Sequence, residues 1–160
     1  MSRRKKASFK RDIGVDYRYS SELVQKFINV IMFSGKKNVA RSIVYGAIDQ
    51  LIKKAGGDKD KGLDLFLKAF EEVVPAVEVR ARRVGGSVYQ IPREIRTDRA
   101  RALAIRWLIK AAASRPDKTM SQRLANELIE AHEGRGMAVK KKIDVHKMAE
   151  SNRAFSHYAW

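Results

Sequence analysis

The stretch VEVRARRVGGSVYQIPR, residues 77–93, decides the fold, because the spacing of apolar residues changes there from a helical period to a period of two. Residues 77–82 and 88–91 form two β-type runs, and the glycines Gly85 and Gly86 between them favour a tight turn, since both accept a positive φ. The stretch therefore predicts a two-stranded β-hairpin. With a two-residue turn, the predicted cross-strand pairs are Arg82 with Tyr89, Arg80 with Ile91, and Glu78 with Arg93.

Pro92 limits where this hairpin can lie. Proline has no amide hydrogen to donate to a neighbouring strand, so the hairpin cannot sit inside a larger sheet. We interpret residues 76–95 as an isolated arm with one exposed, basic face.

Helical patterns flank the hairpin on both sides. Before it, apolar residues recur at spacings of three and four over 22–31, 39–52 and 63–74, and after it over 98–113, 120–131 and 139–148. Ser20 or Ser21 is expected to cap the first helix and Gly35 to end it, while Pro75 stops the third. Thr119 to Gln122 has the form of a capping box for the fifth helix. In the last helix Val139, Ile143 and Met148 mark the apolar pattern.

The expected fold class is therefore mainly α: a bundle of about six helices with one protruding two-stranded β-hairpin between helices three and four. This expected fold divides the chain into three regions. Residues 1–19 form a basic extended tail, 20–150 a single helical domain that carries the arm 76–95, and 151–160 an aromatic C-terminal tail.

The composition fits a folded domain with an anionic partner. The 160 residues are 44% hydrophobic, which separates the chain from disordered basic tails, and the absence of cysteine removes disulfides, thiolate chemistry and cysteine-based zinc sites. The formal net charge is +16, which is costly self-repulsion unless an anion offsets it. Nucleic acid is the leading candidate, ahead of a membrane surface, and no apolar stretch is long enough to cross a bilayer.

This charge is concentrated in two regions. Residues 1–11 contain six basic residues and no acid, and residues 76–115 contain ten basic residues against three acids, nine of the ten being arginine. Arg99, Arg106 and Lys110 fall within a narrow arc of the predicted fourth helix, and the adjacent arc, with Trp107, is expected to be core. Arginine matches phosphate oxygens with a planar fork, so this pattern favours close contact with the phosphates of a nucleic acid over mere solubility.

Aromatic residues leave two interpretations open. Tyr89 is either a platform on which a base stacks or a packing residue of the hairpin face. The C-terminal Phe155, Tyr158 and Trp160 dock either on a protein partner or back on the body, because loose tails are usually polar.

No catalytic or metal site is expected. His132, His146 and His157 lack the spacing of a metal motif, and the Gly35-Lys36-Lys37 sequence lacks the first glycine of a phosphate-binding loop. We therefore expect no enzyme, no metal and no cofactor. The alternative is an architectural DNA-binding protein that inserts a basic β-ribbon arm into a groove, although the arm has no apolar wedge at its tip. An RNA-modifying enzyme and a membrane-surface protein fit less well.

Motifs along nearly the whole chain resemble one family. They include Arg82-Arg83-Val84-Gly85-Gly86-Ser87, Arg106-Trp107, Arg123-Leu124-Ala125-Asn126-Glu127-Leu128 and the ending Ala154-Phe155-x-His157-Tyr158. The chain is similar to the bacterial type of small ribosomal subunit protein seven. The resemblance implies a structural protein that binds small-subunit ribosomal RNA first, nucleates assembly of the head, and lies at the subunit interface near the exit-site tRNA.

The resemblance also implies particular contacts. Carried over by position, the RNA-binding residues are Lys10, Arg11, Lys36, Lys37, Arg80, Arg82, Arg83, Arg96, Arg99, Arg106 and Lys110, to which the basic tail adds Arg3 and Arg4 and the hairpin adds Tyr89. Gly85 and Gly86 would approach the exit-site tRNA, with messenger RNA a further candidate. The aromatic tail would point toward ribosomal protein eleven, with protein nine another neighbour. We expect no membrane contact, no homo-oligomer, and a place in ribosomes of the cytoplasm or an organelle.

The chain departs from the family pattern in the fourth helix. Ala100 stands where the family usually has a second arginine, and Arg101 follows one place on. We therefore expect the cationic stripe to contact RNA differently at this point.

Overall fold

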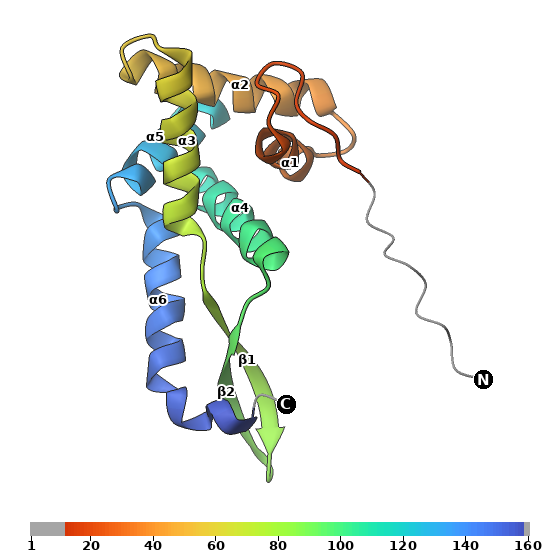
Figure 1. Cartoon of the computed structure of the whole chain (residues 1–160), viewed down its shortest axis with the longest axis vertical. Helices are drawn as coiled ribbons and strands as arrows, with labels where there is room; N and C mark the ends of the chain where they lie inside the picture. Colours follow the sequence, from red (N-terminus) through yellow and green to blue (C-terminus); the bar gives the residue numbers. More distant parts are fainter. Residues whose placement is uncertain (1–11, 159–160) are drawn as a thin grey trace, which may run out of the picture.

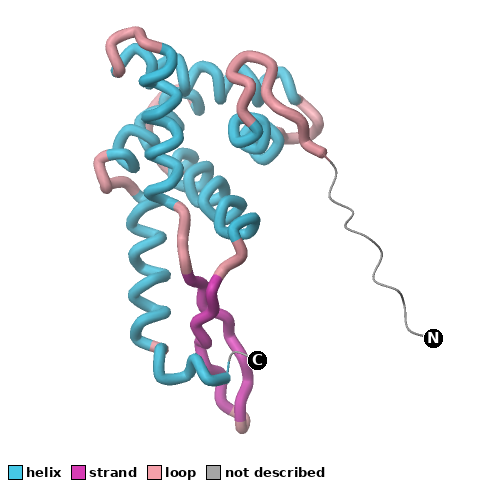
Figure 2. Tube along the Cα trace, viewed as in Figure 1, coloured by secondary structure: helices cyan, strands magenta, loops and turns pink. Residues whose placement is uncertain are grey.

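The computed structural model describes residues 12–158, without the side chains of residues 84, 157 and 158. In this range six α-helices and one β-hairpin follow one another, as Figures 1 and 2 show. The elements are α1 (Glu22–Ile31), α2 (Lys37–Lys54), α3 (Lys59–Val73), β1 (Val77–Val84), β2 (Ser87–Glu94), α4 (Thr97–Ala113), α5 (Met120–His132), α6 (Met137–Ser151) and the 3₁₀ helix η1 (Arg153–Tyr158). The order confirms the predicted fold class, with the hairpin between helices three and four.

The hydrophobic core lies mainly among the first five helices, and Ala138 and Val139 of α6 join it. Helix α5 is its centre, because it packs against α2, α3 and α4 and fully buries Leu124 and Leu128. Phe27 of α1 meets Phe66 and Phe70 of α3 edge to face, with ring centroids 5.2 and 5.9 Å apart. These ring contacts hold α1 against α3.

The ends of the helices follow the predicted signals, with one exception. The Ser21 side chain caps α1, and Thr119 and Gln122 form the full capping box of α5. Gly35 does not end the first helix as predicted. Helix α1 ends at Ile31 with Met32 as its C-cap. Gly35 lies in the turn before α2 at φ +73°, a backbone conformation that glycine adopts easily because it has no Cβ.

The hairpin has the predicted register. Arg82 pairs with Tyr89, Arg80 with Ile91 and Glu78 with Arg93, in an antiparallel ladder. Gly85 and Gly86 close it with φ values of +57° and +90°, both positive as a tight primed turn requires.

The hairpin is not an isolated arm, so that prediction is wrong. Helix α6 runs alongside it and packs against both strands, and η1 packs against β2 (Figure 1). The amide of Ala76, just before β1, donates to Nε2 of His146 at 3.3 Å. Ile91 of β2 is an apolar side chain that would otherwise face solvent, and in the packed hairpin it is only 2% exposed.

Helix α6 turns a different side inward from the one expected. Val139 is buried as predicted, but Ile143 and Met148 are 44% and 42% exposed, and the residues that α6 buries with Val139 are Ala138, Val145 and Ala149.

Candidate nucleic-acid interface

The hairpin presents cations on both of its faces. Residues paired across an antiparallel ladder project to the same side, so Arg80 and Arg82 share a face with Ile91, whereas Arg83 lies on the opposite face with Val88. Ile91 is buried and Val88 is 62% exposed. The prediction of one exposed basic face is therefore wrong: the face with three arginines, Arg80, Arg82 and Arg93, is the partly covered one, and Arg83 is exposed on the other.

Two predicted RNA-binding arginines share one carboxylate at the base of the hairpin. Nε of Arg80 donates to Oε1 of Glu78 at 2.9 Å, and Nε of Arg99 in α4 donates to Oε2 at 2.8 Å. Burial of Glu78 works to raise its pKa, but the hydrogen bonds from Arg99 and Arg80 outweigh it and hold the pKa below its ordinary value. The cluster keeps a net positive charge and fixes the direction in which both guanidinium groups point.

A second set of cations has no acidic partner among the described residues. These side chains are all exposed and form no ion pair in the part of the chain that the structure describes; they are Arg83, Arg93, Arg96, Arg106 and Lys110. Unpaired surface cations are available to phosphates without first breaking a salt bridge. Arg93 is not among the predicted contact residues, although it is one of the ten basic residues in the cluster 76–115, which could have suggested it.

Helix α4 carries the predicted cationic stripe. Arg99, Arg106 and Lys110 are exposed, while Ala104 and Leu108 on the other side are fully buried. Ala100, which departs from the family pattern, is 4% exposed and belongs to the buried side, and Arg101 is exposed. Trp107 packs against the core as predicted but stays half-buried, because it also lines a surface groove.

Lys36 and Lys37 lie apart from the hairpin. They begin α2 at the turn that follows α1, and Figure 1 places this turn at the end of the molecule away from the hairpin tip. Phe33 beside them is 81% exposed. The structure therefore links the hairpin to the start of α4 through Glu78, which Arg80 and Arg99 share, and leaves the α1–α2 turn as a separate cationic site.

The predicted contact residues Arg3, Arg4, Lys10 and Arg11 lie outside the described residues, as does Trp160. The chain that follows the basic tail is anchored on α2. Asp16, 1% exposed, accepts a 2.6 Å hydrogen bond from the Tyr45 hydroxyl, and the Arg18 guanidinium pairs with Asp49 at 2.7 Å.

Tyr89 is a packing residue in this structure. Its ring lies against that of Phe155 in η1, with centroids 4.7 Å apart. One face of the Tyr89 ring is thus covered, which favours the packing interpretation over the stacking platform. Through Phe155 the C-terminal tail docks on its own hairpin.

Neither a metal site nor a membrane span is seen in residues 12–158. No three His, Asp or Glu side chains gather there as metal ligands would, and no described helix is long and apolar enough to cross a membrane.

Comparison with known proteins decides the family. Residues 2–153 match the family described as ribosomal protein S7p/S5e. The chain belongs to the ribosomal protein S7 family. Relatives named small ribosomal subunit protein uS7 agree over the whole of both chains: the chain is 56% identical to the one from Azorhizobium caulinodans, 55% to that from Bartonella tribocorum and 54% to that from Caulobacter sp. strain K31. The resemblance seen in the motifs is confirmed.

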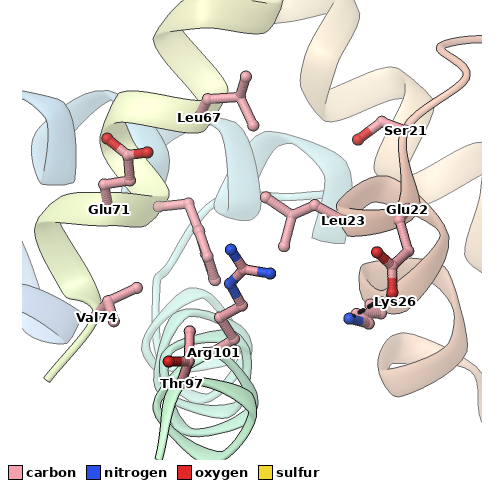
Figure 3. Close-up of a pocket in the computed structure, with 10 residues that line it drawn as sticks. Ser21, Glu22, Leu23, Lys26, Leu67, Glu71, Val74, Thr97 and Arg101 are labelled. Carbon is pink, nitrogen blue, oxygen red and sulfur yellow. Dashed lines mark ion pairs between the residues drawn. The ribbon is translucent and has the colours of Figure 1, made fainter.

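As a member of the S7 family, the protein is a structural component of the ribosome and not an enzyme. Its function therefore depends on surfaces that bind other molecules. Figure 3 shows one of them, a groove of about 580 Å³ between α1, α3 and α4, into which Arg101 points. Glu22, paired with Lys26 at 2.7 Å, and Glu71 also line it. Because acids balance the bases there, this groove of the S7-family protein does not suit a polyanion.

Proposed function

We propose that the chain is a structural protein of the small ribosomal subunit that binds small-subunit ribosomal RNA directly and early, and so nucleates assembly of the subunit head. The observation that carries the proposal is a set of exposed cations, on the hairpin and on and just before α4, that form no ion pair with a described acid: Arg83, Arg93, Arg96, Arg106 and Lys110. Ribosomes of the cytoplasm or of an organelle would be its location.

The mechanism is electrostatic and geometric. Each cation that meets a phosphate releases condensed counterions, which gives most of the affinity, while the rigid body sets the positions of the cations relative to one another. Arg80 and Arg99 contribute through their Nη groups, since only their Nε atoms are engaged with Glu78. Lys36 and Lys37 would hold a second RNA segment at the other end of the body.

The finer placement follows from the hairpin tip and the C-terminus. Gly85 and Gly86 have no side chains and are exposed, so an RNA backbone such as that of the exit-site tRNA, or messenger RNA, could approach them closely. The C-terminal tail beyond Phe155 would meet ribosomal protein eleven, with protein nine another neighbour.

Ribosomal RNA is favoured over the grooves of duplex DNA. The family assignment favours it, and the cations are not confined to one ribbon face as an arm inserted into a groove would require, since Arg83 lies on the other face and Arg106 and Lys110 lie on α4. They surround the hairpin and continue along α4, an arrangement that suits a folded RNA approaching from more than one side.

The test is a binding competition. The purified protein is titrated with labelled small-subunit ribosomal RNA at several salt concentrations, in the presence of excess large-subunit ribosomal RNA or excess duplex DNA. The expected result is retention of the small-subunit RNA against both competitors, with protection of head-domain nucleotides in a footprint. Equal displacement by any polyanion would refute the proposal.

A further inference from the structure

A second surface groove lies between the last turns of α4 and the start of α6. Trp107, Lys110, Ala111 and Ser114 line it from α4, and Met137 and Lys141 line it from α6, around a volume of about 450 Å³. Trp107 is half-buried and packs against the core, so its ring is held in place at the wall of the groove. Met137 is 57% exposed and leaves the groove open to solvent.

The charge on this groove has one sign. Lys110 and Lys141 are exposed and form no ion pair with a described acid, and no acidic side chain lines the groove. The groove with Arg101 has Glu22 and Glu71 in its wall, and the adjoining groove between α1 and α4 has Asp12, Glu22 and Asp98. Of these three grooves, only the one at Trp107 complements a polyanion.

The occupant has to combine negative charge with a flat apolar surface. An unpaired RNA nucleotide does so, because its base stacks on aromatic rings and its phosphates attract ammonium groups. The groove is also continuous with the cationic stripe of α4, since Lys110 belongs to both. An acidic peptide would satisfy the two lysines but has no comparable use for the indole.

We propose that the groove binds a single unpaired RNA nucleotide, with its base against the Trp107 indole and its flanking phosphates beside Lys110 and Lys141. This inference rests on the proposed RNA-binding function and adds to it a recognition site for a base, which a surface of cations alone does not provide. Paired RNA would be excluded, because its bases are stacked on one another.

Tryptophan fluorescence tests the proposal directly. The chain has two tryptophans, so in a Trp160→Phe variant all tryptophan emission comes from Trp107. This full-length variant is titrated with a single-stranded RNA hexanucleotide and, separately, with an abasic oligomer of the same length and charge. The expected result is saturable quenching by the hexanucleotide and none by the abasic oligomer. Adding Lys110→Ala and Lys141→Ala should weaken the quenching about tenfold.

The matched control removes two lysines elsewhere. Lys59→Ala with Lys68→Ala changes the net charge equally on α3 and should leave the quenching curve unchanged. Anisotropy of labelled RNA, recorded in the same samples, separates the possible failures. RNA that binds without changing Trp107 emission, or equal quenching by the abasic oligomer, would overturn the groove inference alone. Tighter quenching by a peptide of glutamate and leucine would make the groove a protein site instead. Loss of binding to small-subunit ribosomal RNA, measured by anisotropy with the same full-length variant, would refute the proposed function itself.

Discussion

Replacing Glu127 by alanine should destabilise the protein more than any other single loss of a carboxylate in the described chain. The Glu127 side chain is fully buried. Its Oε2 accepts from Nη1 of Arg115 at 2.7 Å, and its Oε1 accepts from the amide of Ala138 at 2.9 Å. Gly136, the N-cap of α6, has no side chain to cap that helix, so the carboxylate from α5 does so in its place.

The size of the effect follows from these two bonds. A hydrogen bond to a charged group contributes about 1.5–3 kcal/mol, and the buried amide of Ala138 would be left without an acceptor. Arg115 keeps Glu130 and Asp117 as partners, which limits the loss. We therefore expect Glu127→Ala to lower the free energy of unfolding by about 3–4 kcal/mol. Glu130→Ala should cost only about 1 kcal/mol, since that side chain is 40% exposed.

Equilibrium urea unfolding, followed by far-ultraviolet circular dichroism, measures both values. Glu127→Gln keeps the side-chain volume and one acceptor oxygen, so it should fall between the wild type and the alanine variant. A loss for Glu127→Ala no larger than that for Glu130→Ala would refute the reasoning, because the buried carboxylate would then contribute no more than the half-exposed one.

Three further outcomes are expected, each read by the same unfolding assay. Gly62→Ala should destabilise, although alanine is the better helix former, because its Cβ would lie 2.8 Å from the Ile52 backbone; a gain in stability would contradict this packing. Phe155→Ala should cost about 1–2 kcal/mol by uncovering Tyr89, and an unchanged midpoint would show that the contact contributes nothing. Burial holds the pKa of His146 below its ordinary 6.5, so the unfolded chain binds a proton that the folded chain does not, and the free energy of unfolding should fall as the pH drops below that value. His146→Gln should flatten this dependence.

Structural features that depend on residues close together in the chain could be predicted from the sequence alone. Alternating residues and a Gly-Gly pair define a hairpin register, and the spacing of Thr119 and Gln122 defines a cap, because the interacting groups lie a few residues apart. The stripe of Arg99, Arg106 and Lys110 follows from helical geometry alone. For these features no tertiary information is needed.

Features that depend on distant partners could not be predicted. Arg115 was counted with the basic residues, but it is bound by Glu127 and Glu130 from another helix. Arg99 likewise meets Glu78, which lies 21 residues away. A count of charges along the chain treats such arginines as free, and only the tertiary structure, in which α4 packs on α5 and Arg99 reaches Glu78, shows which are engaged.

The covered hairpin has a similar cause. A two-stranded ribbon with a buried isoleucine needs a third element, but nothing in the pattern of residues 77–93 says which one supplies it. Helix α6 does so along a narrow strip, which leaves Ile143 and Met148 exposed and hides the usual amphipathic signature. The docking of Phe155 on Tyr89 depends on the same arrangement.

In the proposed mechanism, hairpin cations that pair with no described acid bind the RNA, and the net charge of the chain does not. The most direct measurement compares two variants that change the net charge equally, Arg83→Glu with Arg93→Glu and Lys59→Glu with Lys68→Glu. For each, the affinity for small-subunit ribosomal RNA is measured as a function of salt. The hairpin variant should bind more weakly, with a log–log salt slope reduced by about 1.4–1.8, while the α3 variant keeps nearly the wild-type slope. Equal losses in the two variants would contradict the account.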